Sequence, residues 1–215
     1  KPTVRLSSSV IYNIWIWLSL KKADAIFTLT KSAFLQLKKI GLNSSEILVI
    51  PWGVRIAKDQ HPQINTALIR KRYKCADDEL LIVLLPRVIG DELVTYIKCF
   101  KEKFNHFNAR FVFAIRPTRY LDSLSNLGSD NFIIESGPDD FYDVLTSADL
   151  AIADVGSQKG ILSSSLLPLA WMESMLRRTP VFTNDAPGVE ELILNNHNGL
   201  IYKDDDDLIQ KLNMV

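Results

Sequence analysis

The sequence has few of the residues from which metal sites and disulfide frameworks are built. Its 215 residues include two cysteines and three histidines. Cys75 and Cys99 have no metal-like spacing, and His61, His106 and His197 are scattered along the chain. These counts argue against a zinc site and against a disulfide scaffold, and they predict a reduced, cytoplasmic setting.

An excess of charge of one sign is also missing. The chain has 25 Lys and Arg residues and 25 Asp and Glu residues, so its formal net charge at pH 7 is zero. Proteins that bind nucleic acid usually carry a positive excess, because they neutralise phosphates. The balance therefore argues against nucleic acid as a partner. The acidic run 204–207 predicts a solvated turn and a helix start rather than a metal site.

The sequence contains no Walker loop, no glycine-rich dinucleotide fingerprint and no hydrophobic run long enough to cross a bilayer. Its most apolar N-terminal stretch covers residues 10–20. Two roles fit this stretch. It is either a core or interdomain helix, or a peripheral contact with a membrane surface through Trp15 and Trp17. The second role would make the cytoplasmic protein membrane-associated.

What the chain does contain is a regular alternation of apolar strands and helices. The strand segments are unbroken apolar runs, which is typical of a parallel sheet with helices on both faces. The predicted strands are 25–30, 47–54, 80–85, 110–115, 132–134, 150–153, 180–183 and 199–202. The predicted helices are 31–40, 66–74, 91–104, 120–127, 139–147, a central one ending at 177–178, 188–194 and one from 206. The predicted fold class is therefore α/β, with a Rossmann-like parallel sheet.

Ligands of parallel sheets bind outside the carboxyl ends of the strands. The loops expected there are 86–90, 116–119, 154–165 and 184–191. In the third of these loops, Lys159 lies between two glycines. That loop either cradles a phosphate or is a plain flexible connection.

The stretch 163–182 concentrates the chemical signals. Three serines can cap its helix, and Pro168 suits an early helical position. The free amides and the positive dipole end of such a helix favour an anion such as phosphate. An unpaired carboxylate in an apolar helix is costly, so Glu173 needs a partner or a place on a cleft wall. The combination predicts a phosphorylated, hydroxyl-bearing ligand. The alternative is a simple cap, with Glu173 paired to an arginine.

Several segments carry a further resemblance through their order along the chain. They are Ala23–Ser32, Ile47–Val54, Leu85–Val88, Ala148–Ile152, Met172–Val181, Ala186–Glu191 and Asn198–Ile201. In this order they resemble the motifs of the family 4 glycosyltransferases of the GT-B fold. The resemblance implies that residues 57–215 form the C-terminal, nucleotide-sugar-binding domain. Residues 1–56 would be the remnant of an N-terminal, acceptor-side domain and the interdomain connection.

The resemblance also implies an activity and its residues. It implies a hexosyltransferase-like, retaining, metal-independent enzyme without a cofactor, which takes a UDP- or GDP-linked sugar and a glycan, lipid or protein acceptor. Arg87 would stabilise the diphosphate leaving group, and Glu173 would hold the ribose hydroxyls. Ser165 stands where the family meets the donor sugar and completes the predicted catalytic pair with Arg87. The other predicted donor-binding residues are Ser164, Leu166, Leu167 and Lys159.

The chain departs from the family pattern in the donor site. Ser165 replaces the first glutamate of a paired-glutamate motif, and residues 90–92 (Gly-Asp-Glu) stand where a phosphate-binding lysine is expected. These departures motivate an alternative, a catalytically degenerate glycosyltransferase-like subunit that acts as a structural or regulatory partner. A third interpretation is another GT-B or Rossmann-like enzyme, such as a nucleotide-sugar epimerase, which needs an acid or base near the sugar.

We also expect the chain to be a fragment of a longer protein. It starts with Lys1 rather than Met, and a helical pattern is still running at Val215. Because most of an N-terminal domain would then be missing, the expectation is that this chain alone transfers no sugar.

Overall fold

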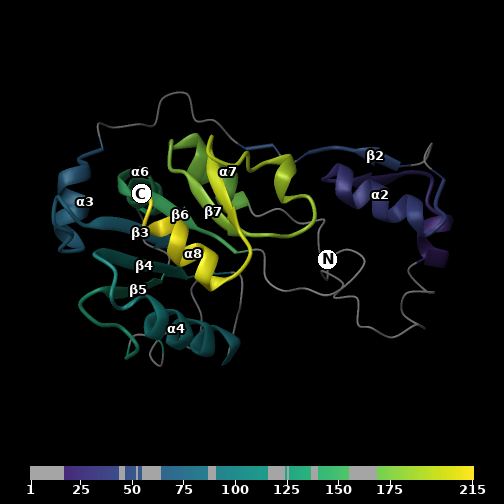
Figure 1. The fold of residues 1–215 in the computed structure, drawn as a ribbon. Helices are drawn as coiled ribbons and strands as arrows, with labels where there is room; N and C mark the ends of the chain where they lie inside the picture. Colours follow the sequence, from purple (N-terminus) through teal and green to yellow (C-terminus); the bar gives the residue numbers. More distant parts are fainter. Residues whose placement is uncertain are drawn as a thin grey trace.

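The computed structural model describes residues 17–43, 47–51, 53–54, 64–86, 91–115, 124, 126–136, 140–154 and 169–215. These residues form two units (Figure 1). The small unit, within residues 17–54, contains strands β1 (Ile26–Thr28) and β2 (Ile47–Val49), which pair in parallel, and helix α2 (Lys31–Lys39). The large unit, within residues 64–215, is built on six parallel strands.

The large unit alternates strands and helices. Its strands are β3 (Leu80–Leu84), β4 (Ala109–Ile115), β5 (Phe132–Ser136), β6 (Leu150–Ile152), β7 (Val181–Asn184) and β8 (Gly199–Tyr202). Its helices are α3 (Thr66–Arg72), α4 (Asp91–Phe104), α6 (Phe141–Ser147), α7 (Leu169–Leu176) and α8 (Asp205–Leu212), with a 3₁₀ turn η3 (Val189–Glu191).

The sheet order shows how the chain winds. All neighbouring strands run parallel, in the order β5-β4-β3-β6-β7-β8. The first strand of the sheet, β3, therefore lies in its middle, and the chain winds outward first to one side and then to the other. This is the arrangement of Rossmann-like sheets. The predicted fold class is confirmed.

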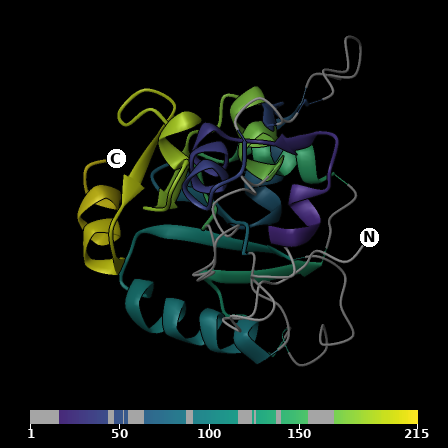
Figure 2. The ribbon, with the colours of Figure 1, turned by 90° about the vertical axis from the view of Figure 1, so that its right-hand side faces the viewer.

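Alternate residues of the central strand point to opposite faces of the sheet, as the two-residue period of a strand requires. Ile82 and Leu84 pack in an apolar cluster with side chains of α4 and α8. Leu81 and Val83 belong to a second cluster, with side chains of α6 and α7. Figure 2 shows α4 on one side of the strands, with the other helices arranged around them. Both faces of the sheet are thus covered.

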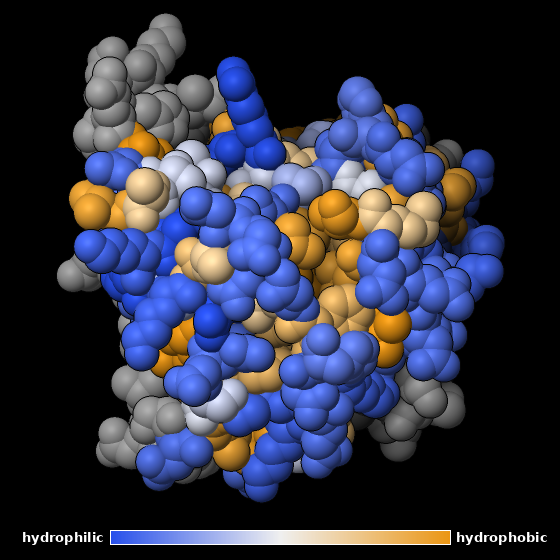
Figure 3. Space-filling view, turned by 60° about the vertical axis from the view of Figure 1, so that its left-hand side comes forward, coloured by the Kyte–Doolittle hydropathy of each residue, from blue (hydrophilic) through white to orange (hydrophobic). Residues whose placement is uncertain are grey.

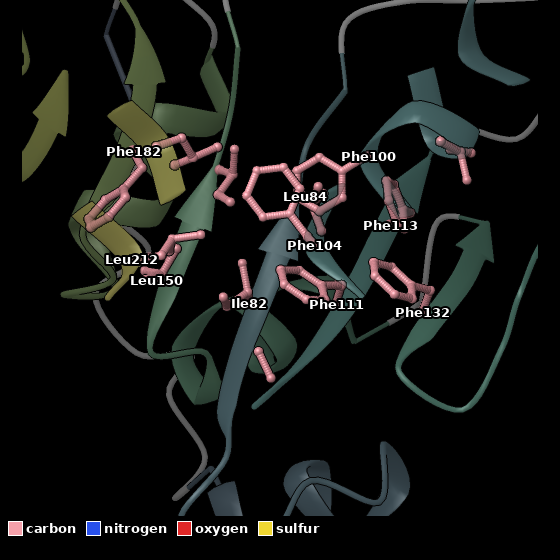
Figure 4. Packing of buried hydrophobic residues seen from close by; sticks show 14 of the residues in the cluster. Ile82, Leu84, Phe100, Phe104, Phe111, Phe113, Phe132, Leu150, Phe182 and Leu212 are labelled. Carbon is pink, nitrogen blue, oxygen red and sulfur yellow. The ribbon is translucent and has the colours of Figure 1, made fainter. Parts of the chain in front are cut away.

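The cluster beneath α4 is rich in phenylalanine (Figure 4). Phe100 and Phe104 stack with ring centroids 4.2 Å apart, and Phe100 meets Phe111 edge-on at 5.3 Å. Phe111 in turn stacks on Phe132 of β5 at 4.9 Å. Such pairs add stabilisation beyond the burial of apolar area. They tie β4, β5 and α4 into one packed layer.

Two expected elements differ from the structure. The predicted helix 188–194 is only the turn η3, because Gly188 before it has a φ of 89° and Leu192 after it has a φ of −120°, both outside the right-handed helical region. Segment 47–54, predicted as a buried strand that runs into a turn, is a strand over Ile47–Val49 only. The predicted helix 120–127 lies mostly outside the described residues.

Trp17 bears on the two roles predicted for residues 10–20. It lies in a short helical segment, 17–21, and its indole Nε1 donates to the carbonyl oxygen of Ile40 at 2.8 Å. It also packs against the buried cluster of the small unit. These are contacts of a core helix. Trp15 lies outside the described residues, and membrane contact stays a prediction. Within the part of the chain that the structure describes, no helix is long and apolar enough to cross a membrane.

Candidate functional site

The order of the strands creates a switch point between β3 and β6. From β3 the chain goes on to β4 on one side of this point, and from β6 it goes on to β7 on the other side. Ligands of such sheets bind in the crevice at the carboxyl ends of the strands. The backbone N–H of Leu85 donates to the carbonyl oxygen of Ile152 at 2.9 Å, so the two strand ends are fixed side by side. Pro86 and Asp154, the first residues of the loops 86–90 and 154–165 that were predicted to meet the ligand, follow these two strand ends.

Helix α7 is anchored at the same edge. The fully buried Trp171 donates from its Nε1 to the carbonyl oxygen of Ala153, just beyond β6, at 2.8 Å. At the other end of the helix, the Thr179 hydroxyl donates to the carbonyl oxygen of Leu145 at 2.6 Å. Because both contacts are buried, the position of α7 relative to the carboxyl end of β6 is set by the fold itself.

Glu173 lies half-buried on α7 and does have a partner, as its apolar setting predicts. Its Oε1 accepts a hydrogen bond of 3.0 Å from the hydroxyl of Tyr142 on α6, which raises the pKa of that phenol. The guanidinium of Arg177 lies 3.8 Å from the centre of the Tyr142 ring. Arg177 also contacts the backbone carbonyl of Glu173, at 3.4 Å from Nη1. The partner is therefore a tyrosine, with the expected arginine stacked behind it.

The remaining predicted site residues cannot be placed. Six of them lie outside the described residues: Arg87, Lys159, Ser164, Ser165, Leu166 and Leu167. Glu173 is thus the predicted site residue whose surroundings are known.

Asp154 is a residue of this edge that the sequence analysis did not single out. It directly follows Ala153 at the end of β6, and its carboxylate accepts hydrogen bonds from the hydroxyls of Tyr202 on β8 and of Tyr96 on α4, the latter at 3.4 Å. Its pKa is raised to about 6, chiefly because burial disfavours the charged form. The nearby Asp205 adds to this shift, and hydrogen bonds with Tyr96 and the backbone of Asn184 oppose it.

Asp154, whose carboxyl has this raised pKa, is the first residue of the loop 154–165, which was predicted to hold the donor. Its position as the first charged residue after a buried strand was the available signal. The two tyrosines that bury it stand 58 and 48 positions away, and no sequence pattern connects them to it.

The motif Ala148–Ile152 has a structural explanation at the opposite edge. Asp149 precedes β6, and its Oδ2 accepts hydrogen bonds from the backbone N–H of Leu81 at 2.7 Å and from Arg70 Nη1 at 2.9 Å. This carboxylate links the amino ends of β3 and β6 to α3. It does not reach the carboxyl edge.

Two of the cavities formed by described residues lie beside α3. One of about 690 Å³ is lined by Thr66, Ala67, Arg70, Lys71, Lys74, Cys75, Ala76 and Asp77. The other, of about 400 Å³, runs along β5 and is lined by Arg72, Tyr73, Lys74, Ser129, Asp130, Ile133, Ile134 and Glu135. Neither includes Glu173 or Asp154. No group of three or more His, Cys, Asp or Glu side chains suited to a metal ion occurs among the described residues.

No family model and no curated protein sequence matches the chain. Solved structures do resemble it. HepE from Anabaena, in complex with UDP and glucose, has a TM-score of 0.72 at 14% identity, over 94% of this chain and 56% of that one. Sucrose-phosphate synthase from Thermosynechococcus elongatus has a TM-score of 0.65 at 17% identity, over 100% and 55%. WaaG, a glycosyltransferase involved in lipopolysaccharide biosynthesis, has a TM-score of 0.65 at 17% identity, over 97% and 60%.

These similarities concern the fold. The chain spans a little over half the length of HepE and of sucrose-phosphate synthase. At the level of the fold, the predicted resemblance to GT-B glycosyltransferases is confirmed.

Proposed function

We propose that the chain is the donor-binding part of a glycosyltransferase, which transfers a sugar from a nucleotide sugar to a glycan, lipid or protein acceptor. The observation that carries this proposal is the place of α7. Its buried Trp171 ties it to the carboxyl end of β6 at the switch point, and the same helix carries Glu173. A carboxylate is a suitable acceptor for the paired hydroxyls of a ribose. The complex of HepE with UDP and glucose supports the same ligand class.

The finer parts of the proposal concern mechanism and residues. We propose a UDP- or GDP-linked donor and a transfer with retention that needs neither a metal ion nor another cofactor. Arg87 would stabilise the leaving diphosphate, with Lys159 as a second cation, and the amides of Ser164, Leu166 and Leu167 would contact the phosphates and the sugar. Ser165 would meet the donor sugar.

Calorimetric titration of UDP, GDP and ADP tests the proposal. We expect one nucleotide to bind in the micromolar range. Glu173→Ala and Arg87→Ala should each weaken that binding at least about tenfold, which is about 1.4 kcal/mol. Glu102→Ala is the matched control, because this exposed carboxylate lies on α4, away from α7.

Tyr142→Phe separates the carboxylate from its neighbour. It removes the hydroxyl that occupies Glu173 Oε1 and keeps the ring under Arg177. A ribose that bonds to Glu173 must compete with this hydroxyl, so we expect the variant to bind the nucleotide at least as tightly as the wild type. If no nucleotide binds the folded chain, the donor-site proposal fails, and the degenerate partner subunit becomes the better explanation. We further expect no transfer by this chain alone.

A further inference from the structure

A carboxylate of the large unit caps a helix of the small unit. Glu191 Oε2 accepts the backbone N–H of Lys31 and its Oε1 accepts that of Ser32, both at 2.7 Å. The next amide, of Ala33, donates to the side chain of Thr30 at 3.0 Å. The first three free amides of α2 are therefore satisfied, two of them by a residue 160 and 159 positions further along the chain.

The sequence of α2 explains why it takes a partner from elsewhere. Its first turn contains no acidic residue, and its last turn carries Lys38 and Lys39. The two lysines complement the negative, C-terminal end of the helix dipole. The positive, N-terminal end has no acidic residue nearby in the sequence, so its anion must come from elsewhere. Glu191 supplies it through two short, charge-assisted bonds, and such paired bonds fix direction as well as distance.

Glu191 itself is held firmly on the large unit. Glu191 is the last residue of the turn η3, which follows Gly188. Two residues near it in the chain have buried side chains: Val189, the first residue of the turn, and Ile193, two positions after Glu191. Both belong to the second apolar cluster of the large unit. The turn follows β7, so the carboxylate projects from the edge of the sheet where the candidate site lies.

The two units share none of the buried clusters found among the described residues. The clusters of the large unit draw on residues 69–212, and the cluster of the small unit draws on residues 17–47. Interfaces that lack a large apolar contact allow relative motion by default. Directional polar contacts then decide the arrangement. The Glu191 contact is also exposed to water, so it can break without disturbing either core.

We infer that Glu191 is a latch that sets how the small unit lies against the large unit. The closed arrangement is the one described above, in which the Glu191 carboxylate accepts the Lys31 and Ser32 amides of α2. Loss of the cap releases the small unit, which stays joined to the large unit by the chain between β2 and α3. In sugar transfer, this latch would align the acceptor side with the donor side, and that consequence rests on the proposed function. The latch itself does not.

Distances between labels on the two units test this inference. Cys99 is a free, exposed cysteine on the large unit, and Cys75 is buried. Lys39→Cys adds a second exposed label site at the end of α2. Spin labels are attached at Cys99 and at the new cysteine, and the distance between them is measured by double electron–electron resonance, with Glu191 intact and with Glu191→Ala. We expect the distribution to broaden towards longer distances in the variant, while the circular dichroism of the folded chain is retained.

Amide hydrogen exchange gives a second readout at the contact itself. In Glu191→Ala, exchange at Lys31 and Ser32 should accelerate at least about tenfold, because hydrogen bonds to a charged group are lost. Ala33, which Thr30 caps, is the internal reference. Glu191→Gln keeps the shape but has one acceptor oxygen in place of two, so we expect an intermediate effect on both readouts.

Glu190→Ala is the matched control, since this exposed carboxylate precedes Glu191 in the same turn. It should change neither readout. The inference is overturned if Glu191→Ala leaves the distances and the exchange at Lys31 and Ser32 as in the wild type, or if Glu190→Ala changes them equally. Neither readout uses a nucleotide, so failure of the latch is distinguishable from failure of the donor site.

Discussion

The two units use similar strands and bury them to different extents. In the large unit, residues 81–84 of β3 are all 0% exposed, because helices cover both faces. In the small unit, α2 covers one face of β1 and β2, and side chains of the other face remain open: Phe27 is 62% exposed, Leu48 50% and, just beyond β2, Ile50 51%. The face of the molecule on the α3 side is by contrast largely hydrophilic, with one apolar band near its middle (Figure 3).

An apolar strand does not determine its own burial. Both units pair apolar strands in parallel, and the number of covering layers decides whether one face or two become core. The large unit has apolar clusters on both faces of its sheet. The small unit has one covered face, and its arrangement depends on contacts such as that of Glu191.

The strongest test of this difference is to truncate a phenylalanine in each unit. Phe111→Ala should lower the free energy of unfolding by about 4 kcal/mol, because it opens a cavity among stacked rings. Phe27→Ala should cost less than about 0.5 kcal/mol, because this side chain is mostly in water. Urea unfolding of both variants measures the two values. Equal costs would mean that Phe27 is covered in solution, and the comparison between the units would be wrong.

The pH dependence of stability tests the burial of Asp154 in the large unit. A carboxyl whose pKa is raised in the folded state weakens folding as pH rises from its ordinary value to the raised one. The rise of the Asp154 pKa from 3.8 to about 6 corresponds to a loss of folding stability of about 3 kcal/mol. This loss is absent below pH 3.8 and reaches its full size above about pH 6. We therefore expect the stability of Asp154→Asn relative to the wild type to increase by about that amount between pH 4 and pH 7.

Chemical unfolding at several pH values across this window measures the difference. The asparagine variant keeps a side chain of the same size at this position after β6, within reach of Tyr96 and Tyr202. A difference that does not change with pH would show that Asp154 is solvated rather than buried.

Close backbone packing in the large unit gives a third prediction. A Cβ atom added at Gly199 of β8 would lie 2.0 Å from the carbonyl oxygen of Val181 on the neighbouring strand. Gly199→Ala should therefore lower stability by about 2–3 kcal/mol, since backbone must move. Gly53→Ala is the control within the small unit, because an added Cβ there meets nothing within 4 Å. Thermal unfolding of the two variants measures the difference. Equal losses of stability in Gly199→Ala and Gly53→Ala would show that β7 and β8 do not pack this closely at Gly199.

The smallest expected effects come from helix caps, one in each unit. The Thr30 side chain accepts from Ala33 at 3.0 Å, and the Asp204 side chain accepts from the Asp207 amide at 2.9 Å. Replacing either residue with alanine should cost about 1 kcal/mol. Because the units have separate cores, Thr30→Ala should speed amide exchange in the small unit only, and Asp204→Ala in the large unit only. Exchange that accelerates throughout the chain in either variant would show that the units unfold together.

Much of the fold could be predicted from the sequence, because burial on both faces leaves unbroken apolar runs. The predicted strand 80–85 is β3 with one residue more, and the acidic run 204–207 does cap and start a helix, α8. The helix expected over 188–194 was wrong, since the left-handed backbone of Gly188 follows from local geometry that a glycine permits but does not require.

The candidate site was less predictable, because its contacts join distant positions. That Glu173 needs a partner follows from its apolar helix, but the choice of Tyr142 depends on how α6 packs beside α7. The burial of Asp154 and the cap formed by Glu191 likewise arise only when remote elements meet. The assignment of the donor-contacting residues to loop 154–165 stays a prediction.

The central place of β3 also has a consequence for how the protein is made. This strand is synthesised before all its neighbours and pairs with β4 on one edge and β6 on the other. On the ribosome, β3, β4 and β5 can assemble first, while the second edge of β3 stays unpaired until Leu150–Ile152 emerge. An open, apolar strand edge invites pairing with another chain. Nascent chains that pause before β6 should therefore be the form most in need of a chaperone.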